Sequence, residues 1–314
     1  MMRILVTGAA GFIGSHLALR LVREGHEVVA VDNLSTGRRE NIPTGVEFLQ
    51  LDLAASDFVK ALPGGRFDAV CHLAAQSSGE ISGEDPVYDV RANALSTLQL
   101  SRWCLRNRTP RFLYASSMAV YGDPARLPVA ETDACSPLSF YGISKMSSEH
   151  FLRLAAREGL STTSFRMFSV YGPGQNLENL RQGMVSIYMA YMLKGQEVPV
   201  KGSLQRFRDF IYIDDVVEAW LKALIAPSTK SPVYNLGSGR GTTVQELLST
   251  LKWALQLPPD YPVKELPGSR SDQFGLRANI QRAGSELDWR PTTDLVSGLQ
   301  RMSEWALSML EGIR

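Results

Sequence analysis

The chain opens with a short strand, a glycine-rich turn and a helix, and this order constrains its fold more than any other feature. Residues 3–7 are the apolar, β-branched run of a buried parallel strand. Gly8, Gly11 and Gly14 follow, and apolar residues then recur at helical spacing as far as Val22. Such a turn lets the backbone approach a pyrophosphate, and the helix aims its free N–H groups at the anion. The sequence therefore predicts a phosphate cradle, with one more residue between the first two glycines than is usual.

An acidic residue at the end of the next predicted strand indicates which dinucleotide fits this cradle. That strand covers residues 27–32, and Asp32 stands 18 residues after Gly14. A carboxylate there accepts hydrogen bonds from an adenosine ribose and repels a 2′-phosphate, so the pattern favours NAD over NADP. Arg38 and Arg39 could instead hold a 2′-phosphate, but exposed loop arginines are the simpler interpretation.

Composition argues against several classes of protein. The 314 residues carry 33 Lys and Arg against 32 Asp and Glu, so no basic field attracts nucleic acid or an acidic membrane. No apolar run approaches the ~20 residues of a membrane span. Cys71, Cys104 and Cys135 are widely spaced, and the four histidines lack metal-ligand spacing, so we expect neither a disulfide nor a metal site. The N-terminus enters the first strand directly, without a signal peptide, and we expect a soluble, cytoplasmic protein.

Strands and helices alternate through the first half of the chain, which predicts an α/β fold with a doubly wound parallel sheet of the Rossmann type. Further strands are expected at residues 46–50, 68–73, 111–116 and 164–168, and helices at 56–62, 86–106 and 140–157. After residue 174 the alternation stops, and we expect a smaller mixed α/β C-terminal substrate lobe. It has helices at 180–194, 216–225, 244–255 and 295–310, and strands at 210–213 and 233–236. The predicted domains are 1–171, rejoined by parts of 207–240, and 172–314.

Tyr141 and Lys145 lie four residues apart on a predicted helix, so their side chains project from the same face. A tyrosine, whose pKa is near 10, needs a shift of ~3 units, or roughly 4 kcal/mol, to act as a base at neutral pH. A fixed cation beside it favours the phenolate, and the positive ring of an oxidised nicotinamide can add to the effect. Ser117, at the carboxyl end of the fifth predicted strand, could hydrogen-bond the same substrate oxygen.

Together these residues resemble the extended short-chain dehydrogenase/reductases, specifically the NAD-dependent nucleotide-sugar epimerase/dehydratase group. The resemblance covers nearly the whole chain and is specific as a run. Its motifs lie at residues 8–14, 32–37, 52–53, 72–76, 93, 117, 141–145, 166–174, 208–215 and 234–239.

The resemblance implies a role for each matching residue. Tyr141 would be the base at a sugar 4-hydroxyl, helped by Ser117, and Lys145 would hold the nicotinamide ribose. Arg208 would grip the nucleotide diphosphate. Arg270 would be a second clamp or a plain surface arginine, because the family arginine stands one residue earlier. The implied cofactor-binding residues are Gly8, Gly11, Phe12, Ile13, Gly14, Asp32, Asn33, Asp52, Leu53, Leu73, Ala74, Ala75, Asn93, Tyr141 and Lys145. The implied substrate-binding residues are Ser117, Met118, Ser169, Arg208 and Arg270.

Departures from the family pattern narrow the expected reaction. Met118 and Ala119 stand where dehydrating relatives carry an acid pair, and Ala119 where decarboxylating relatives carry a glutamate. Without those acids, neither elimination nor decarboxylation has its expected general acid or base. Ser169 replaces the usual asparagine beside the diphosphate and sugar, which leaves the fine specificity open.

We therefore expect an NAD-dependent 4-epimerase of a UDP-hexose, acting through a transient 4-keto sugar. The hexose is of the glucose/galactose, N-acetyl or uronic acid type. Two alternatives stay open: a nucleotide-sugar dehydrogenase or keto-sugar reductase that exchanges NAD(H), and a non-catalytic NAD-sensing protein. The resemblance also implies a role in nucleotide-sugar metabolism and polysaccharide biosynthesis.

The resemblance also implies a homodimer, formed by pairing the helices at 86–106 and 140–157. Val90, Leu98 and Trp103 are candidate contacts, or equally part of the intrachain core. Asp214 and Asp215 are expected only to cap the helix that follows them. His16 is expected on a helix surface without a role.

Overall fold

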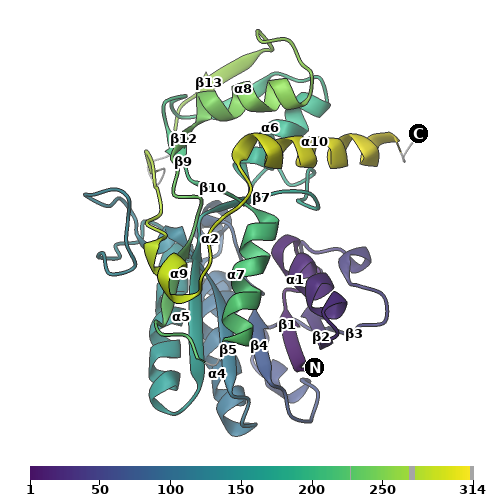
Figure 1. Cartoon of the computed structure of the whole chain (residues 1–314), viewed down its shortest axis with the longest axis vertical. Coiled ribbons are helices and arrows are strands. Elements are labelled where there is room, and N and C mark those ends of the chain that lie inside the picture. The colour runs from purple at the N-terminus through teal and green to yellow at the C-terminus, as the bar shows by residue number, and fades with distance from the viewer. Residues whose placement is uncertain (227, 269–272, 312–314) are drawn as a thin grey trace.

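Seven parallel strands form the central sheet, in the order β11-β6-β5-β4-β1-β2-β3. They appear in a computed structural model that describes residues 1–226, 228–268 and 273–311 (Figure 1). The strands are β1 (Arg3–Thr7), β2 (Glu27–Asp32), β3 (Glu47–Gln50), β4 (Ala69–His72), β5 (Arg111–Ser117), β6 (Ser161–Met167) and β11 (Val233–Leu236). This arrangement confirms the doubly wound α/β fold predicted from the alternating pattern.

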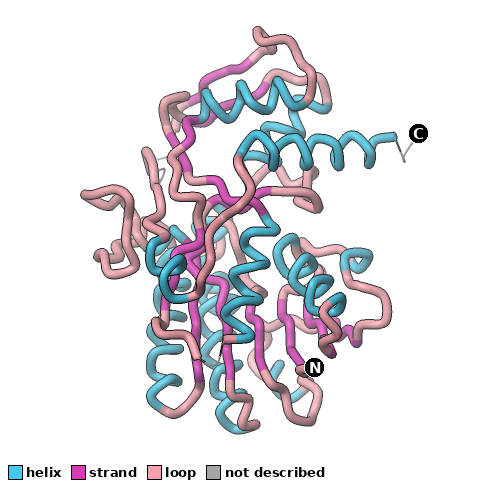
Figure 2. Tube along the Cα trace, in the orientation of Figure 1, coloured by secondary structure: helices cyan, strands magenta, loops and turns pink. Residues whose placement is uncertain are grey.

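Two helical layers cover the two faces of the sheet (Figure 2). The helices α1 (Phe12–Arg23) and α7 (Ile213–Ile225) lie over one face, where Phe165 of β6 packs 5.0 Å from the ring of Trp220. The helices α4 (Ser96–Arg106) and α5 (Phe140–Arg157) lie over the other face, against Phe112. Successive strand residues point to opposite faces, so nearly continuous apolar strands feed both cores.

The smaller lobe lies above the carboxyl ends of the strands in Figure 1. Its helices are α6 (Met184–Leu193), α8 (Val244–Ala254) and α10 (Leu295–Glu311), and β8 (Val198–Lys201) pairs in parallel with β13 (Val263–Leu266). Two further strand pairs lie between the lobes: β7 (Ser169–Tyr171) with β10 (Phe210–Tyr212), and β9 (Phe207–Arg208) with β12 (Thr242–Thr243). The remaining helices are α2 (Gly79–Glu84), α3 (Pro86–Val90) and α9 (Gln281–Glu286), with single turns η1 (Arg39–Asn41), η2 (Phe58–Lys60) and η4 (Met118–Val120).

The chain returns to the first lobe after leaving it. Although α7 and β11 follow residue 172, they belong with the sheet. The helix α7 lies beside α1 on one face of the sheet, and β11 pairs with β6 at its edge. The segment 207–240 therefore contributes to both lobes, whereas the boundary at residue 171 stays a prediction.

Several element ends differ from the sequence-based prediction, each for a local reason. The helix expected from residue 180 begins only at Met184, because Gly183 has a φ of +89° and ends the preceding loop. Of the helix expected at 56–62 only the single turn η2 forms. The strand expected at 164–168 already begins at Ser161, because buried hydroxyls such as that of Thr162 find partners there.

The helix expected at 86–106 forms, with an interruption in its middle. The Asp85 side chain caps α3 by accepting from Tyr88 N at 2.9 Å, and Pro86 occupies the first turn as predicted. A π-helical stretch, η3 (Arg91–Leu95), then joins α3 to α4.

The expected cap role of Asp214 and Asp215 is wrong. Both lie inside the first turn of α7, and the residue at the N-cap position is Tyr212. The buried Asp215 carboxylate instead accepts hydrogen bonds from the backbone N–H groups of Thr292, at 2.8 Å, and Thr293, at 3.1 Å. It thereby fixes the segment that leads into α10.

Two further expectations need correction. His16 is not a free surface side chain: its Nε2 lies 2.9 Å from the Pro173 carbonyl oxygen, and its ring packs edge-on against Phe12. Trp103 belongs to the intrachain core beside Phe67, with ring centroids 5.8 Å apart, and is not available as a dimer contact.

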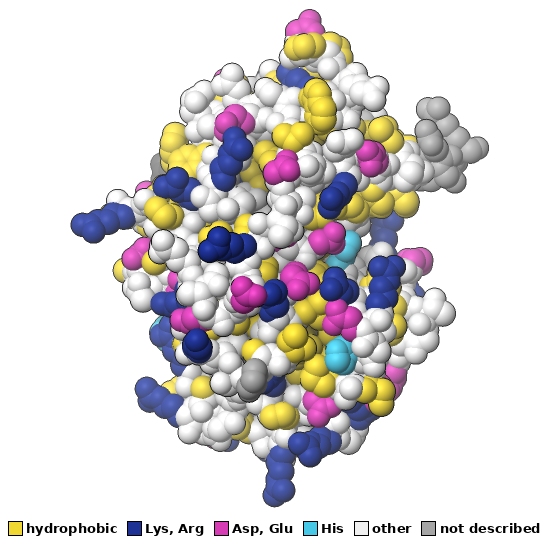
Figure 3. Space-filling model, viewed as in Figure 1, with side chains coloured by type: hydrophobic (Ala, Val, Ile, Leu, Met, Phe, Trp, Pro, Cys, Tyr) yellow, Lys and Arg dark blue, Asp and Glu magenta, His cyan; other side chains and the backbone are white. Residues whose placement is uncertain are grey.

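The surface carries both signs of charge, interspersed on the face shown in Figure 3. Within the described ranges, no helix is both long and apolar enough to cross a membrane.

Candidate functional site

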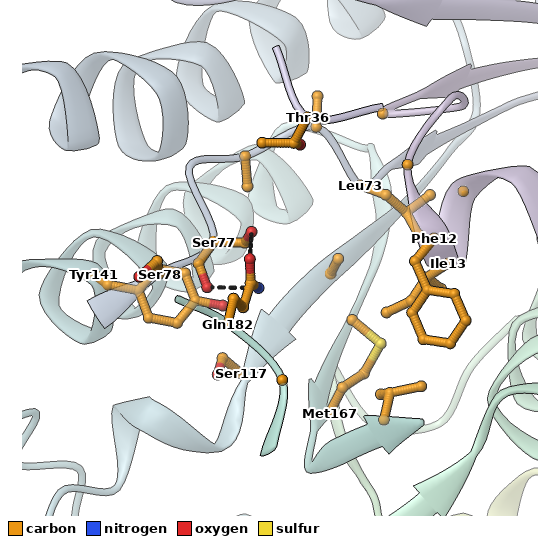
Figure 4. Close-up of a pocket in the computed structure, with 18 of the residues that line it drawn as sticks. Phe12, Ile13, Thr36, Leu73, Ser77, Ser78, Ser117, Tyr141, Met167 and Gln182 are labelled. Atoms are coloured by element: carbon orange, nitrogen blue, oxygen red, sulfur yellow. Dashed lines mark hydrogen bonds between the residues drawn. The ribbon is translucent and has the colours of Figure 1, made fainter. Parts of the chain in front are cut away.

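A cleft of about 670 Å³ opens along the carboxyl ends of the central strands, between the two lobes. It is lined at one end by the glycine turn and at the other by residues of β5 and α5 (Figure 4). Ligands of doubly wound sheets bind at this edge.

The glycine turn forms a cradle that side chains would fill. Gly8 has a φ of +69°, and a Cβ on Gly14 would lie 2.0 Å from the Gly8 carbonyl oxygen. The N-cap of α1 is Gly11, which offers no side-chain acceptor, and the first turn holds no acidic residue. The first N–H groups of α1 are therefore left for an anionic ligand, as the phosphates of a dinucleotide require.

Asp32 lies at the end of β2 and shapes the next part of the cleft. Its buried carboxylate accepts from Ala10 N at 3.0 Å and from Leu34 N at 2.8 Å. Beside it, Asn33 donates to the Asp52 carboxylate at 3.3 Å. The acid is thus held in place at the position where an adenosine ribose is expected.

The two arginines that could have held a 2′-phosphate have other partners. Arg38 pairs with Glu178, and the guanidinium of Arg39 lies 4.0 Å from the ring centre of Phe48. Neither observation supports a 2′-phosphate site, and both agree with the preference for NAD inferred from Asp32.

Most of the residues assigned by resemblance to the cofactor line this cleft. They are Gly8, Gly11, Phe12, Ile13, Gly14, Asp32, Asn33, Asp52, Leu53, Leu73, Ala74, Ala75, Tyr141 and Lys145. Asn93 does not line it. Its side chain is buried behind the cleft and donates to the Gln76 carbonyl and to Asp89 and Ser144, at 3.0–3.1 Å. Any contribution of Asn93 to the site is therefore indirect.

The end of the cleft away from the glycine turn brings Tyr141, Ser117 and Lys145 together. Tyr141 is the second residue of α5, Lys145 follows one turn later, and Ser117 ends β5. Figure 4 shows the Tyr141 and Ser117 side chains at the same end of the cavity. The Lys145 ammonium donates to the Ala115 carbonyl at 2.8 Å and lies 5.7 Å from the Tyr141 ring centre.

Burial dominates the proton affinities of this pair. It raises the pKa of Tyr141 to about 12, although the Ser117 hydroxyl opposes the rise. It lowers the pKa of Lys145 to about 7, although the negative charge of Asp89 opposes the fall. In the protein without NAD, therefore, the pKa of Tyr141 lies above its usual value, and the positive nicotinamide ring, which we expect from the sequence to add to the effect of Lys145, would have to lower it.

A loop crosses the cleft beside these residues, and we call its residues 173–183 the strap. Gln182 in the strap exchanges two hydrogen bonds with Ser77, each 3.0 Å long (Figure 4). Arg181 pairs with Glu80 at 3.1 Å and also with Glu84. Because these contacts join the strap to the loop after β4 and to α2, they narrow the cleft at the end that holds Tyr141 and Ser117.

The strap and the residues 77–80 were not predicted as part of the site. Ser77 and Ser78 come from a loop and Glu80 from α2, neither of which has a motif of its own, and Gln182 lies 105 residues away from Ser77. No local pattern in the sequence indicates that these two loops meet.

The predicted substrate residues lie on several elements. Met118 in η4, Ser169 at the start of β7, and Arg208 in β9 line the cleft. Arg208 is buried, and its guanidinium donates to the Phe207 carbonyl at 2.8 Å. Burial lowers the pKa of Arg208 to about 10, an effect that an anionic ligand would reverse. Arg270 lies outside the described residues.

Clusters of three or more His, Cys, Asp or Glu side chains suited to a metal ion do not occur in the part of the chain that the structure describes.

Comparison with known proteins gives consistent matches over nearly the full length. The family described as "NAD dependent epimerase/dehydratase family" matches residues 4–237. A UDP-glucose 4-epimerase from Thermotoga maritima, solved with UDP-glucose, is 35% identical, with a TM-score of 0.91 over 98% of this chain and 100% of that one.

Two other solved structures are similar. A Thermus thermophilus UDP-glucose 4-epimerase in complex with NAD is 34% identical, with a TM-score of 0.88 over 97% of this chain and 98% of that one. A UDP-N-acetylglucosamine 4-epimerase from Methanobrevibacter ruminantium, in complex with UDP-N-acetylmuramic acid, is 28% identical. Its TM-score is 0.90, over 98% of this chain and 99% of that one.

Proposed function

Because the chain belongs to the NAD dependent epimerase/dehydratase family, we propose that it interconverts two UDP-hexoses that differ in configuration at carbon 4. The observation that carries the proposal is the convergence of Tyr141, Ser117 and Lys145 at one end of a cleft whose other end is the glycine cradle. Tyr141 would then be a base beside the space that a sugar and a nicotinamide would share.

The cofactor is NAD, and the chain has the groups to hold it. The cradle from Gly8 to Gly14 would bind its phosphates, Asp32 the adenosine ribose, and Lys145 the nicotinamide ribose. When bound, NAD supplies a hydride acceptor that can return the hydride, and a positive charge in the oxidised state.

Tyr141 would remove the proton of the sugar 4-hydroxyl, and Ser117 would hydrogen-bond the same oxygen. A charged Lys145 would stabilise the phenolate. Arg208 would hold the diphosphate, so that the 4-keto sugar stays tethered while its ring turns. The strap would help to exclude water during this step. If carbon 4 lost its hydride to NAD and regained it on the opposite face of the turned ring, Tyr141 would return the proton to the oxygen and the product would be the epimer.

Met118 and Ala119 support epimerisation over the other reactions of the family. Both line the cleft directly after Ser117, where neither side chain can donate or accept a proton. Loss of water or of carbon dioxide from the sugar needs a general acid or base at this point. Oxidation at one carbon and its reversal need only Tyr141, Ser117 and Lys145.

The test is to incubate the purified protein with UDP-glucose, UDP-N-acetylglucosamine and UDP-glucuronate and to separate the products by chromatography. We expect the matching 4-epimer to form, without a steady rise in NADH absorbance. Sustained NADH production without an epimer would instead identify a dehydrogenase.

We also propose that the protein is a homodimer and that it acts in the cytoplasm. Five large apolar side chains on α3 and α5 are exposed, and a second copy would cover them: Val87, Val90, Phe140, Ile143 and Leu154. Cys71, Cys104 and Cys135 are free thiols, as is usual in a reducing compartment. Light scattering on the purified protein tests the dimer, and a monomeric mass would reject it.

A further inference from the structure

Asp89 in α3 is a carboxylate with no exposed surface, and it lies behind the cleft. Its Oδ1 accepts from Gln76 Nε2 at 3.1 Å and from Asn93 Nδ2 at 3.0 Å, and its Oδ2 accepts from Ser144 Oγ at 2.7 Å. Amide N–H groups can only donate, so this environment suits the anion. Burial raises the pKa of Asp89, while Ser144 and the charge of Lys145 lower it.

A buried anion is stabilised by a cation, and the hydrogen bond from Ser144 links Asp89 to the residue that precedes Lys145 in α5. Lys145 follows Ser144 in α5 and is buried as well. The hydrogen-bond acceptor of its ammonium, the Ala115 carbonyl, is neutral, and Asp89 is the charged group that raises the pKa of Lys145.

The other titratable groups around this ammonium do not supply a negative charge at neutral pH. His72 on β4 is neutral, because burial and Lys145 lower its pKa to about 3. The ring centre of Tyr114 on β5 lies 4.9 Å from the ammonium nitrogen and that of Tyr141 lies 5.7 Å from it, and burial raises the pKa of both phenols. Glu149, farther along α5, is paired with Arg166 at 2.7 Å.

From this arrangement we propose that Asp89 is a positioning residue of the catalytic centre. Its buried negative charge keeps Lys145 protonated, and its hydrogen bonds to Ser144 and Gln76 tie the catalytic helix to the loop that carries Ser77. The inference rests on the proposed function only in holding that a charged Lys145 is needed for turnover.

The test compares Asp89→Asn with the matched variant Asp85→Asn. Asp85 is an exposed carboxylate that caps α3, so the control removes the same charge where water screens it. The protonation of Lys145 is followed in NAD-free protein by trace labelling with acetic anhydride across a pH series, with peptide mass spectrometry. The pH dependence of kcat/KM is measured in parallel on the UDP-sugar that the wild type converts.

In Asp89→Asn we expect the Lys145 midpoint to fall by about one pH unit or more, the usual effect of removing a close opposite charge. Labelling of Lys145 at neutral pH should rise several-fold, and the alkaline limb of kcat/KM should move to lower pH by the same amount. Asp85→Asn should leave both curves unchanged. An unshifted midpoint in Asp89→Asn, with activity lost equally at every pH, would overturn the proposal and leave Asp89 a purely structural role.

Two further measurements separate charge from folding. Ser144→Ala removes the shortest hydrogen bond to Asp89 but keeps its charge, so it should move the Lys145 midpoint much less; an equal shift would contradict the proposal. If Asp89→Asn does not fold, the wild type decides, because a Lys145 midpoint below about 6 would mean that the lysine is neutral despite Asp89. The labelling needs no sugar, so it tests Asp89 even if no UDP-sugar is converted.

Discussion

Replacement of Tyr141 by phenylalanine removes one buried hydroxyl and tests the proposed base. Burial raises the pKa of Tyr141 to about 12. The gap to neutral pH is about five units, or roughly 7 kcal/mol, which Lys145 and the charge of bound NAD must reduce. Because a positioned base contributes ~10²–10⁴-fold to a rate, we expect Tyr141→Phe to lower kcat about 10³-fold. NAD content and the melting temperature should stay close to those of the wild type.

The assay is chromatographic conversion of the UDP-sugar at equal NAD occupancy, and the chain offers a matched control. Tyr114 lies closer to the same ammonium than Tyr141 does, at 4.9 Å against 5.7 Å, but it does not line the cleft. Tyr114→Phe should therefore turn over within a few-fold of the wild type. If Tyr141→Phe kept at least about a tenth of the wild-type kcat, the assignment of the base would be wrong.

Three other variants test the cradle, the buried lysine and the buried ion pair. Gly14→Ala should weaken NAD binding by at least about 100-fold in calorimetry, because the new Cβ would lie 2.0 Å from the Gly8 oxygen. Gly64→Ala, whose Cβ would meet no atom within 4 Å, should bind like the wild type. The pKa of Lys145 falls from 10.5 to about 7 on folding, so between these values the unfolded chain binds the extra proton and stability rises with pH. In Lys145→Met this rise should disappear: between pH 7 and pH 10 the free energy of unfolding of NAD-free protein should increase by ~1–3 kcal/mol more in the wild type than in the variant, and equal slopes would contradict the reasoning. Glu149→Gln leaves a buried guanidinium unpaired and should cost ~3–5 kcal/mol in denaturant titration, whereas a loss below about 1 kcal/mol would show that the pair is not needed.

Features with a local cause were predictable from the sequence. The strand, turn and helix around Gly8 and Gly14 follow from residue size and periodicity, and the structure has them where expected. The same holds for α5, in which Tyr141 and Lys145 share a face because they are four residues apart.

Features that depend on contacts between segments far apart in the sequence were not predictable. Ser77 and Gln182 bond across the cleft although 105 residues separate them. Asp215 looks like a helix cap in the sequence, but it binds the backbone of residues 292 and 293. In each case a polar side chain has several possible partners, and the packing of the whole chain selects among them.

The position of β11 in the sheet has a consequence for how this chain is made. The ribosome releases β6 well before residues 233–236, so the edge that β11 will occupy stays unpaired during that interval. The Phe165 side chain likewise stays uncovered until Trp220 of α7 has been synthesised and packs against it. The N-terminal half therefore cannot reach its final form during synthesis until most of the polypeptide has emerged. A nascent chain that stalls after β6 but before β11 would expose an unpaired strand edge to which other chains could bind.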